Sequence, residues 1–256
     1  MHIASWNVNS IRARENQVLN WIDKHRPDVI CLQEIKCLSD EFPYDGFEQL
    51  GYFLTIHGQK AYNGVAIGTL SPPSEIELNV PWVSDSEARG LSLRVRGVQI
   101  ISLYVPNGSA VGSEKYSYKL NWLDHLWQWL DGNSNTDDEL VLCGDFNIAP
   151  EDRDVYDSKA LQGKIPISDE ERKRFASLIN WGLTDAFRVF NDASEQYTWW
   201  DYREAALVRG HGLRIDLHLV TDKILRRIRS VEIDTEPRFN EKPSDHVPVS
   251  LYLMDI

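Results

Sequence analysis

Polar residues with catalytic potential stand at the ends of several apolar runs in this chain. Near the C-terminus, Asp245 directly precedes His246, which opens an apolar run. A carboxylate beside an imidazole can orient the ring of a catalytic histidine. Further polar residues stand at or beside the ends of other apolar runs: Asn7, Glu34, Tyr104, Asn107, Asp145, Asn147 and Asp216. We predict that these side chains converge on one metal-dependent site that hydrolyses phosphodiesters.

Four carboxylates are candidates for holding the metal ion. Hydrolysis of a phosphodiester needs an activated water, an offset for the negative charge of the phosphate and a stabilised leaving oxygen. Carboxylates with bound waters suit Mg²⁺, a hard cation that usually takes only one or two protein carboxylates. The chain offers Glu34, Asp145, Asp216 and Asp245, and it lacks the Cys and His spacing typical of zinc sites.

Each candidate also has a purely structural interpretation. Glu34 would suit a helix N-terminus, and Asp145 would suit an Asx turn. For Tyr104 and His218 the structural interpretation is favoured, with the tyrosine in the core and its hydroxyl satisfied. Asp216 is harder to explain this way, because it lies in an apolar run and a buried unpaired carboxylate is costly. We therefore expect a partner or a metal beside Asp216.

Eight apolar runs predict the strands that must position these residues. Turn signals such as Pro72-Pro73 and Arg96-Gly97 separate some of them. The predicted strands are Ile3–Val8, Asp28–Leu32, Gly64–Leu70, Gly90–Val95, Val98–Val105, Leu140–Gly144, Ile215–Val220 and Val247–Leu253.

Three longer helices are predicted between these strands, each with a serine at its start. Ser10 is expected to cap a helix that ends at Pro27, and Ser113 to cap the longest helix. Ser168 and Glu171 have the spacing of a capping box, and their helix runs to Gly182. Helical spacing predicts the apolar face of the longest helix from Tyr116, Leu120, Leu123, Trp127 and Leu130. This order of elements indicates an α/β fold with two packed sheets and helices outside, in a single domain over residues 1–256.

The composition is that of an ordinary globular protein. The chain has 256 residues, 42% of them apolar, with a net charge of −12. This charge argues against a tight, processive DNA binder, since phosphate contacts supply most of such affinity, but not against a metal-dependent enzyme. The three cysteines, Cys31, Cys37 and Cys143, suggest buried free thiols. No signal sequence or membrane span is visible, so we expect a cytoplasmic protein that does not bind membranes.

The chain resembles the exonuclease III family of the endonuclease/exonuclease/phosphatase superfamily along nearly its whole length. Asp-His and Gly-Asp-x-Asn are typical of the superfamily, whereas Trp-Trp-Asp-Tyr-Arg and Gly-Leu-Arg-Ile-Asp are typical of its DNA-repair branch. The matching segments are Trp6–Arg12, Leu32–Lys36, Gly58–Ala66, Leu103–Gly108, Gly144–Pro150, Thr198–Arg203, Gly212–Asp216 and Lys242–His246.

This resemblance implies a four-layered α/β sandwich whose two sheets are mostly antiparallel. It also implies Mg²⁺- or Mn²⁺-dependent cleavage of duplex DNA 5′ to abasic sites and at 3′ ends, by an expected monomer. By analogy, Glu34 binds the metal with Asn7 beside it, and Asp145 orients or deprotonates the attacking water. Asp245 orients the ring of His246, which contacts the phosphate. Of the remaining implied residues, Asn147 helps to place the water and Asn107 contacts phosphate. Tyr104 lies near the phosphate or the leaving oxygen, and Asp216 supports the site or a second metal position. The expected metal ligands are Glu34, Asn7, Asp145, Asn147 and Asp245.

DNA contacts are expected from loops around the site. Lys115 and Lys119 are interleaved with aromatic residues, although a solvated helix face explains them equally well. Trp199, Trp200 and Leu213 would line a pocket for a base-less sugar or a terminal nucleotide, and at least one tryptophan is expected in the core. Pro166 is unusual for the family in the loop before Ser168 and could alter the balance between internal incision and 3′-end removal.

Two other functions compete with a DNA-repair nuclease. A superfamily relative acting on lipid or inositol phosphates is disfavoured by the Trp-Trp-Asp-Tyr-Arg segment. A non-catalytic binding module would have lost a catalytic group, whereas every catalytic-type position is filled here.

Overall fold

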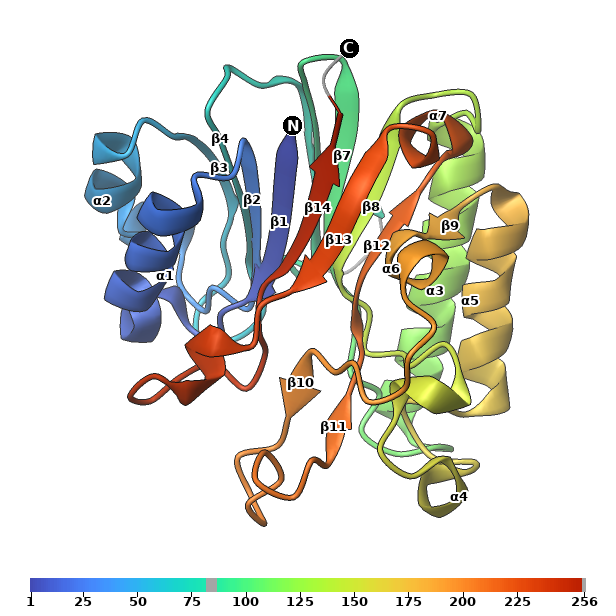
Figure 1. Ribbon diagram of the computed structural model, residues 1–256. Coiled ribbons are helices and arrows are strands. Elements are labelled where there is room, and N and C mark those ends of the chain that lie inside the picture. Colours follow the sequence, from blue (N-terminus) through green and yellow to red (C-terminus); the bar gives the residue numbers. More distant parts are fainter. Residues whose placement is uncertain (82–86, 255–256) are drawn as a thin grey trace.

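The computed structural model describes residues 1–81 and 87–254. Two six-stranded sheets pack face to face, and helices cover the outer face of each sheet (Figure 1). The predicted α/β fold of two packed sheets with helices outside is confirmed. A hairpin of β10 (Trp199–Trp200) and β11 (Gly212–Leu213) projects at the end of the molecule away from the two termini (Figure 1).

The first sheet has the order β13-β14-β1-β2-β4-β3. Only its β1 and β2 pair is parallel, so the sheet is mostly antiparallel, as expected. Its strands are β1 (His2–Asn7), β2 (Val29–Gln33), β3 (Phe53–His57), β4 (Val65–Thr69), β13 (Ile228–Ile233) and β14 (Val249–Leu253).

The second sheet has the order β5-β6-β7-β8-β12-β9 and the same mixture of directions. Its β7 and β8 pair is parallel, and the other neighbours are antiparallel. Its strands are β5 (Ser74–Leu78), β6 (Gly90–Val95), β7 (Val98–Tyr104), β8 (Leu140–Asp145), β9 (Thr184–Asp185) and β12 (Asp216–Val220).

Alternating side chains of the strands fill separate cores on the two faces of each sheet. In β1, Ile3 packs between the sheets with Val29 and Val141, whereas Ala4 faces the helices outside. Cys31 and Cys143 lie between the sheets, and all three cysteines are free and buried, as predicted. The inner core fixes the two sheets against each other and so fixes the strand ends that carry the polar residues.

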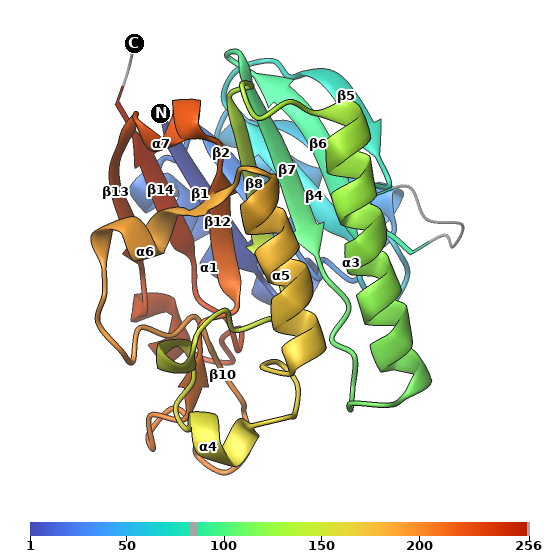
Figure 2. The ribbon, with the colours of Figure 1, turned by 90° about the vertical axis from the view of Figure 1, so that its right-hand side faces the viewer.

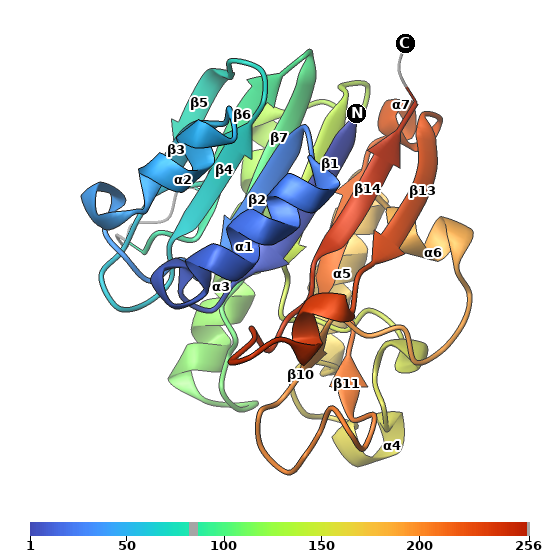
Figure 3. The ribbon, with the colours of Figure 1, turned by 60° about the vertical axis from the view of Figure 1, so that its left-hand side comes forward.

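Helices on the outer faces complete the four layers. Helices α1 (Ile11–His25) and α2 (Tyr44–Gln49) cover the first sheet (Figure 3). Helices α3 (Glu114–Asn133) and α5 (Asp169–Trp181) lie side by side over the second sheet (Figure 2). The shorter helices are α4 (Ser158–Leu161), α6 (Ala186–Phe190) and α7 (Asp222–Leu225), and single 3₁₀ turns lie at Ser39–Glu41, Asp152–Asp154 and Glu236–Phe239.

Two of the three predicted serine caps are confirmed. Ser113 accepts a hydrogen bond from the Tyr116 amide, and Ser168 and Glu171 form the expected capping box. Ser10 occupies the N-cap position of α1, but its side chain makes no cap hydrogen bond. Its φ of 87° departs from the extended backbone that brings a cap side chain over the first turn.

The predicted apolar face of α3 was partly wrong. Trp127 is 37% exposed, whereas Trp122, Leu126 and Trp129 are buried. Lys119 lies on the same buried face. Within the described residues, no helix combines the length and the apolar character needed to cross a membrane.

Candidate active site

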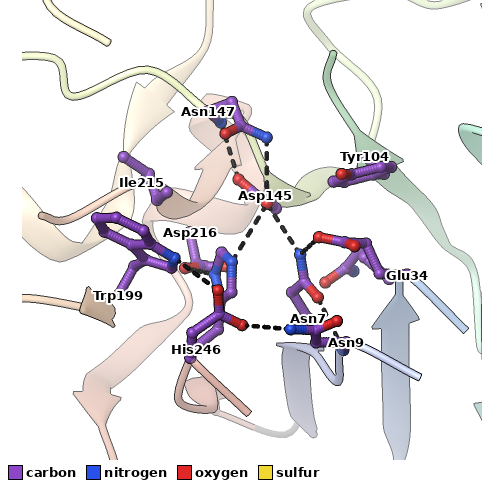
Figure 4. A network of polar contacts seen from close by, with 12 residues as sticks. Asn7, Asn9, Glu34, Tyr104, Asp145, Asn147, Trp199, Ile215, Asp216 and His246 are labelled. Carbon is purple, nitrogen blue, oxygen red and sulfur yellow. Dashed lines mark hydrogen bonds and ion pairs between the residues drawn. The ribbon is translucent and has the colours of Figure 1, made fainter. Parts of the chain in front are cut away.

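The strand registers bring most of the predicted catalytic residues to one edge of the molecule. Tyr104, Asp145 and Asp216 are direct neighbours across β7, β8 and β12. Asn7 ends β1 in the facing sheet, and Glu34 follows the end of β2. His246 lies three residues before β14 begins, so it reaches the same edge (Figure 4). Asp216 is the first residue of its strand, which corrects the expectation that it lies inside one.

The backbone is strained where it delivers these side chains. Glu34 and Asn147 both have a φ of 50°, in the left-handed region that non-glycine residues adopt uncommonly. Gly144 has a φ of 134°, and a Cβ there would lie 2.0 Å from the Leu103 carbonyl oxygen. Only glycine therefore allows β8 to approach β7 closely enough to place Asp145 at the end of the strand.

Asp145 lies at the centre of a network of hydrogen bonds (Figure 4). Its Oδ2 accepts from Asn7 Nδ2 at 2.9 Å, and its Oδ1 accepts from the Asn147 amide at 2.9 Å. The second hydrogen of Asn7 Nδ2 goes to Glu34 Oε1 at 2.8 Å. Asn107 Nδ2 in turn donates to Asn147 Oδ1 at 3.1 Å. Asn7 thus joins the two carboxylates, and Asn107 and Asn147 steady one of them.

Asp216 holds the ring of His246, which corrects the role expected for Asp245. His246 Nδ1 lies 2.8 Å from Asp216 Oδ2. Asp245 instead accepts from Trp199 Nε1 and from Asn9 Nδ2, each at 2.9 Å. Although the two residues are adjacent in the chain, Asp245 and His246 therefore have different hydrogen-bond partners.

Charge governs the protonation of this cluster. Burial lowers the pKa of His246, but Asp216 and Asp145 outweigh burial and raise it to about 10. Burial raises the pKa of Asp145 to about 7; His246 opposes this rise, while Asp216 and Glu34 add to it. The imidazole is therefore a cation at neutral pH, and Asp145 titrates close to neutrality.

The donor atoms suit a hard divalent cation. Oxygens of Glu34 and Asp145 and a ring nitrogen of His246 lie within 4.8 Å of one another. Because His246 is protonated and bound to Asp216, its ring is a poor metal ligand, which leaves the two carboxylates. Oxygen ligands of this kind suit Mg²⁺ or Mn²⁺. The site therefore fits the expected metal ion.

A cavity of about 550 Å³ opens beside this cluster. Trp199 and Leu213 line it, as predicted, and so does Pro166. Trp200 does not line it but packs in the core with Tyr197 and Val247, which corrects its assignment as a DNA contact. At least one tryptophan was expected in the core, and Trp200 fulfils that expectation.

The two lysines differ in position. Lys115 is exposed and borders a second cavity of about 400 Å³ beside Tyr104 and Asn107. Lys119 is fully buried, so it is wrong as a DNA contact. Its alternative interpretation as a solvated helix face is also wrong.

The sequence analysis assigned no role in the site to Asn9 or Tyr156, and it treated His211 only as a loop histidine that could touch a ligand. Asn9 holds Asp245, and it stands in the same Trp-Asn-Val-Asn run as Asn7. Tyr156 and His211 stack in the cavity wall with ring centroids 4.4 Å apart. Neither ring follows an apolar run, so the criterion that found the catalytic residues did not apply to them.

The fold and the site together are those of a phosphoesterase with a carboxylate-rich centre. The chain belongs to the Endonuclease/Exonuclease/phosphatase family, whose model matches residues 4–246. The resemblance found in the sequence is thereby confirmed.

Named relatives cover almost the whole chain. Exodeoxyribonuclease III of Haemophilus influenzae is 36% identical over 97% of this chain and 98% of its own length. A 3′ phosphatase of Neisseria, solved with a product DNA hairpin, is 40% identical with a TM-score of 0.96, and 99% of each chain is covered. An AP endonuclease of Archaeoglobus fulgidus is 35% identical with a TM-score of 0.95, and 99% of each chain is covered.

Proposed function

We propose that this chain is a metal-dependent DNA-repair nuclease, a 3′→5′ exonuclease on duplex DNA that also cuts 5′ to abasic sites. One observation carries the proposal. Asp145, steadied by two amide side chains, lies 3.6 Å from an imidazolium that a second aspartate holds, beside a cavity lined by Trp199 and Leu213. The activities named for the relatives support it.

The charges of the site assign a task to each side chain. Asp145, steadied by Asn7 and Asn147, accepts the proton of the attacking water. The His246 imidazolium, held by Asp216, donates a hydrogen bond to a phosphate oxygen and offsets its charge. Glu34 and Asp145, joined by Asn7, would hold Mg²⁺ or Mn²⁺. When bound, the cation offsets phosphate charge and stabilises the leaving oxygen.

Tyr104 would donate a hydrogen bond to the substrate. Burial raises the pKa of its hydroxyl well above the ordinary value, and the nearby Glu34 and Asp145 add to that rise. The phenol therefore stays protonated at neutral pH. Tyr104 and Asn107 both line the catalytic cavity, where a phosphate or leaving oxygen would lie.

We further propose that 3′-end processing is the stronger activity and abasic incision the weaker. The net charge of −12 and the burial of Lys119 leave little positive charge to grip a long duplex. A 3′ end need not be flipped out of a duplex, which costs a few kcal/mol. Ile165 and Pro166 border the cavity, and the rigid ring of Pro166 would narrow the space for an internal sugar. The Neisseria relative, a 3′ phosphatase, is consistent with this preference. A cytoplasmic, monomeric, single-domain enzyme is part of this proposal.

A matched assay tests both proposals. One duplex carries an internal abasic analogue, a second a recessed 3′ hydroxyl and a third a 3′ phosphate, each with Mg²⁺, with Mn²⁺ and with EDTA. We expect metal-dependent cleavage that is fastest at the 3′ ends. Faster incision at the abasic analogue would refute the proposed preference, and hydrolysis of a phosphoinositide without cleavage of DNA would refute the function. A Pro166→Gly variant that leaves the ratio of activities unchanged would exclude the loop as its cause.

A further inference from the structure

Lys119 is a lysine buried in the helix layer, directly behind the active site. It lies on the inward face of α3. Its Nζ donates to the backbone carbonyl oxygens of Asn147 at 2.6 Å and of Asn107 at 3.3 Å. It also makes a short ion pair with Glu171 of α5. A lysine ammonium has three N–H donors, so all three have partners.

The ion pair is an unfavourable choice for packing alone. Removing two charges from water costs several kcal/mol per ion, and apolar residues of similar size often replace such a pair without loss of stability. Here both charges are fully buried between α3 and α5. Glu171 has a second task, because its Oε2 accepts from the Ser168 amide in the capping box. Lys119 must be explained by its two remaining partners, the carbonyl groups.

The two carbonyl groups belong to residues of the catalytic network. Asn107 follows β7 and Asn147 follows β8, and their side chains bond to each other. Asn147 Nδ2 also donates to Asp145 Oδ2 at 3.2 Å and to the Val105 carbonyl at 3.0 Å. Asn147 has a φ of 50°, in the left-handed region that asparagine adopts more readily than most residues. The bond from the ammonium of Lys119 to the Asn147 carbonyl oxygen fixes the position of this turn.

We propose that Lys119 is a positioning residue, which ties the loops after β7 and β8 together so that Asn107 and Asn147 hold Asp145 in its catalytic orientation. The proposal rests on the nuclease function proposed above. In place of the DNA contact predicted from the sequence, the buried Lys119 would act on the catalytic residues through the two loops that it holds. Loss of a partner that orients a catalytic group from behind typically costs about 10- to 100-fold in activity.

Three variants separate positioning from packing. Lys119→Met removes the donors but leaves Glu171 as an unpaired buried acid, which endangers the fold. The double variant Lys119→Met/Glu171→Gln removes the donors and the charge imbalance together. The matched control is Glu171→Gln, which disturbs the same buried pair but keeps the lysine on both carbonyl groups. Thermal unfolding shows which variants are folded, and kinetics on the 3′-recessed duplex gives kcat and KM.

We expect the folded double variant to lose about 10- to 100-fold in kcat with little change in KM. Glu171→Gln should keep a kcat close to that of the unchanged protein, even if its melting temperature falls. Wild-type kcat in the double variant would overturn the proposal. An equal loss of kcat in Glu171→Gln would also overturn it, because the ion pair rather than the carbonyl contacts would then be responsible.

A measurement without substrate keeps this test separate from the proposed function. In protein labelled with ¹⁵N-asparagine, the side-chain amide signals of Asn107 and Asn147 should shift in the double variant and stay in place in Glu171→Gln. Unmoved signals in the double variant would refute positioning by Lys119. If the unchanged protein cleaves no DNA while the signals shift as expected, the nuclease function fails and the positioning role stands.

Discussion

Exchanging Asp216 for asparagine separates two explanations of how His246 is oriented. The sequence places Asp245 next to the histidine, whereas the structure places Asp216 Oδ2 at 2.8 Å from its Nδ1. Asparagine keeps the size of the side chain but removes its charge. It also presents either an amide oxygen, a weaker acceptor, or an NH₂ group that repels the ring N–H.

The pKa of His246 gives the scale of the effect. A rise from 6.5 to about 10 corresponds to roughly 5 kcal/mol in favour of the imidazolium, supplied against burial by Asp216, Asp145 and Asp245. A single hydrogen bond to a charged group contributes about 1.5–3 kcal/mol to the stability of the charged form. If the transition state loses the full ~1.5–3 kcal/mol of this hydrogen bond, Asp216→Asn should lower kcat by about 10- to 150-fold.

The assay compares Asp216→Asn with Asp245→Asn on the 3′-recessed duplex with saturating Mg²⁺. Asp245 contacts Trp199 and Asn9 at the cavity wall, so its exchange should act more on KM and less on kcat. Circular dichroism and melting temperature confirm that both variants are folded. A larger kcat loss in Asp245→Asn than in Asp216→Asn would refute the assignment of Asp216 as the residue that orients the ring.

Three further predictions follow from the same structure. Asp145→Asn and His246→Ala should each lower kcat by about 10²–10⁴-fold in folded protein, and near-wild-type rates would contradict the site. His246→Ala should also lower the melting temperature, because it leaves Asp216 as a buried acid without its partner. Glu34→Gln should raise the Mg²⁺ concentration for half-maximal activity, because an amide is a poor Mg²⁺ ligand; an unchanged value would place the metal elsewhere. Burial lowers the pKa of His2 to about 4 and of His218 to about 3, so the unfolded chain binds more protons below pH 6.5 and stability falls as the pH drops. In urea unfolding between pH 6 and pH 5, His218→Leu should reduce the loss of unfolding free energy by about 1.2 kcal/mol per pH unit. An equal slope in both proteins would be the contrary result.

The partner of His246 was beyond the reach of the sequence. Asp216 lies 30 positions before the histidine and in the other sheet, so their contact depends on how the sheets pack. The adjacent Asp245 was the nearest carboxylate along the chain, and local order favoured it. Contacts between the two sheets depend on how the core packs between them, so a short sequence segment cannot predict such a contact.

The burial of Lys119, by contrast, left a signal in the sequence. Counted in helical steps of three and four from Tyr116, position 119 lies on the same face as Leu123 and Leu126, which are buried. Its charge and its aromatic neighbours suggested a nucleic-acid contact instead. A charged residue within an apolar helical stripe indicates a buried partner, and Glu171 supplies it.

The missed strands of the two sheets have a common cause. The predicted strands correspond to β1, β2, β4, β6, β7, β8, β12 and β14, which are the inner strands of both sheets. The strands that were missed, β3, β5, β9 and β13, are the edges. Inner strands covered on both faces form nearly continuous apolar runs, whereas edge strands are less covered. All five residues of β5 are exposed, β3 is buried only at Thr55, and β5, β9 and β13 carry acidic residues.

The same difference explains why the catalytic residues could be predicted although a third of the strands in these sheets could not. Each catalytic side chain lies at the end of an inner strand or close beside it: Asn7 on β1, Glu34 after β2, Tyr104 on β7, Asp145 on β8, Asp216 on β12 and His246 before β14. A polar residue stands out where a buried apolar run stops. Loop residues that line the cavity, such as Tyr156 and His211, do not follow an apolar run, so they do not stand out in the sequence. The sequence therefore predicts the catalytic residues of this site better than the residues that select its substrate. Experiments on substrate selectivity must start from the structure.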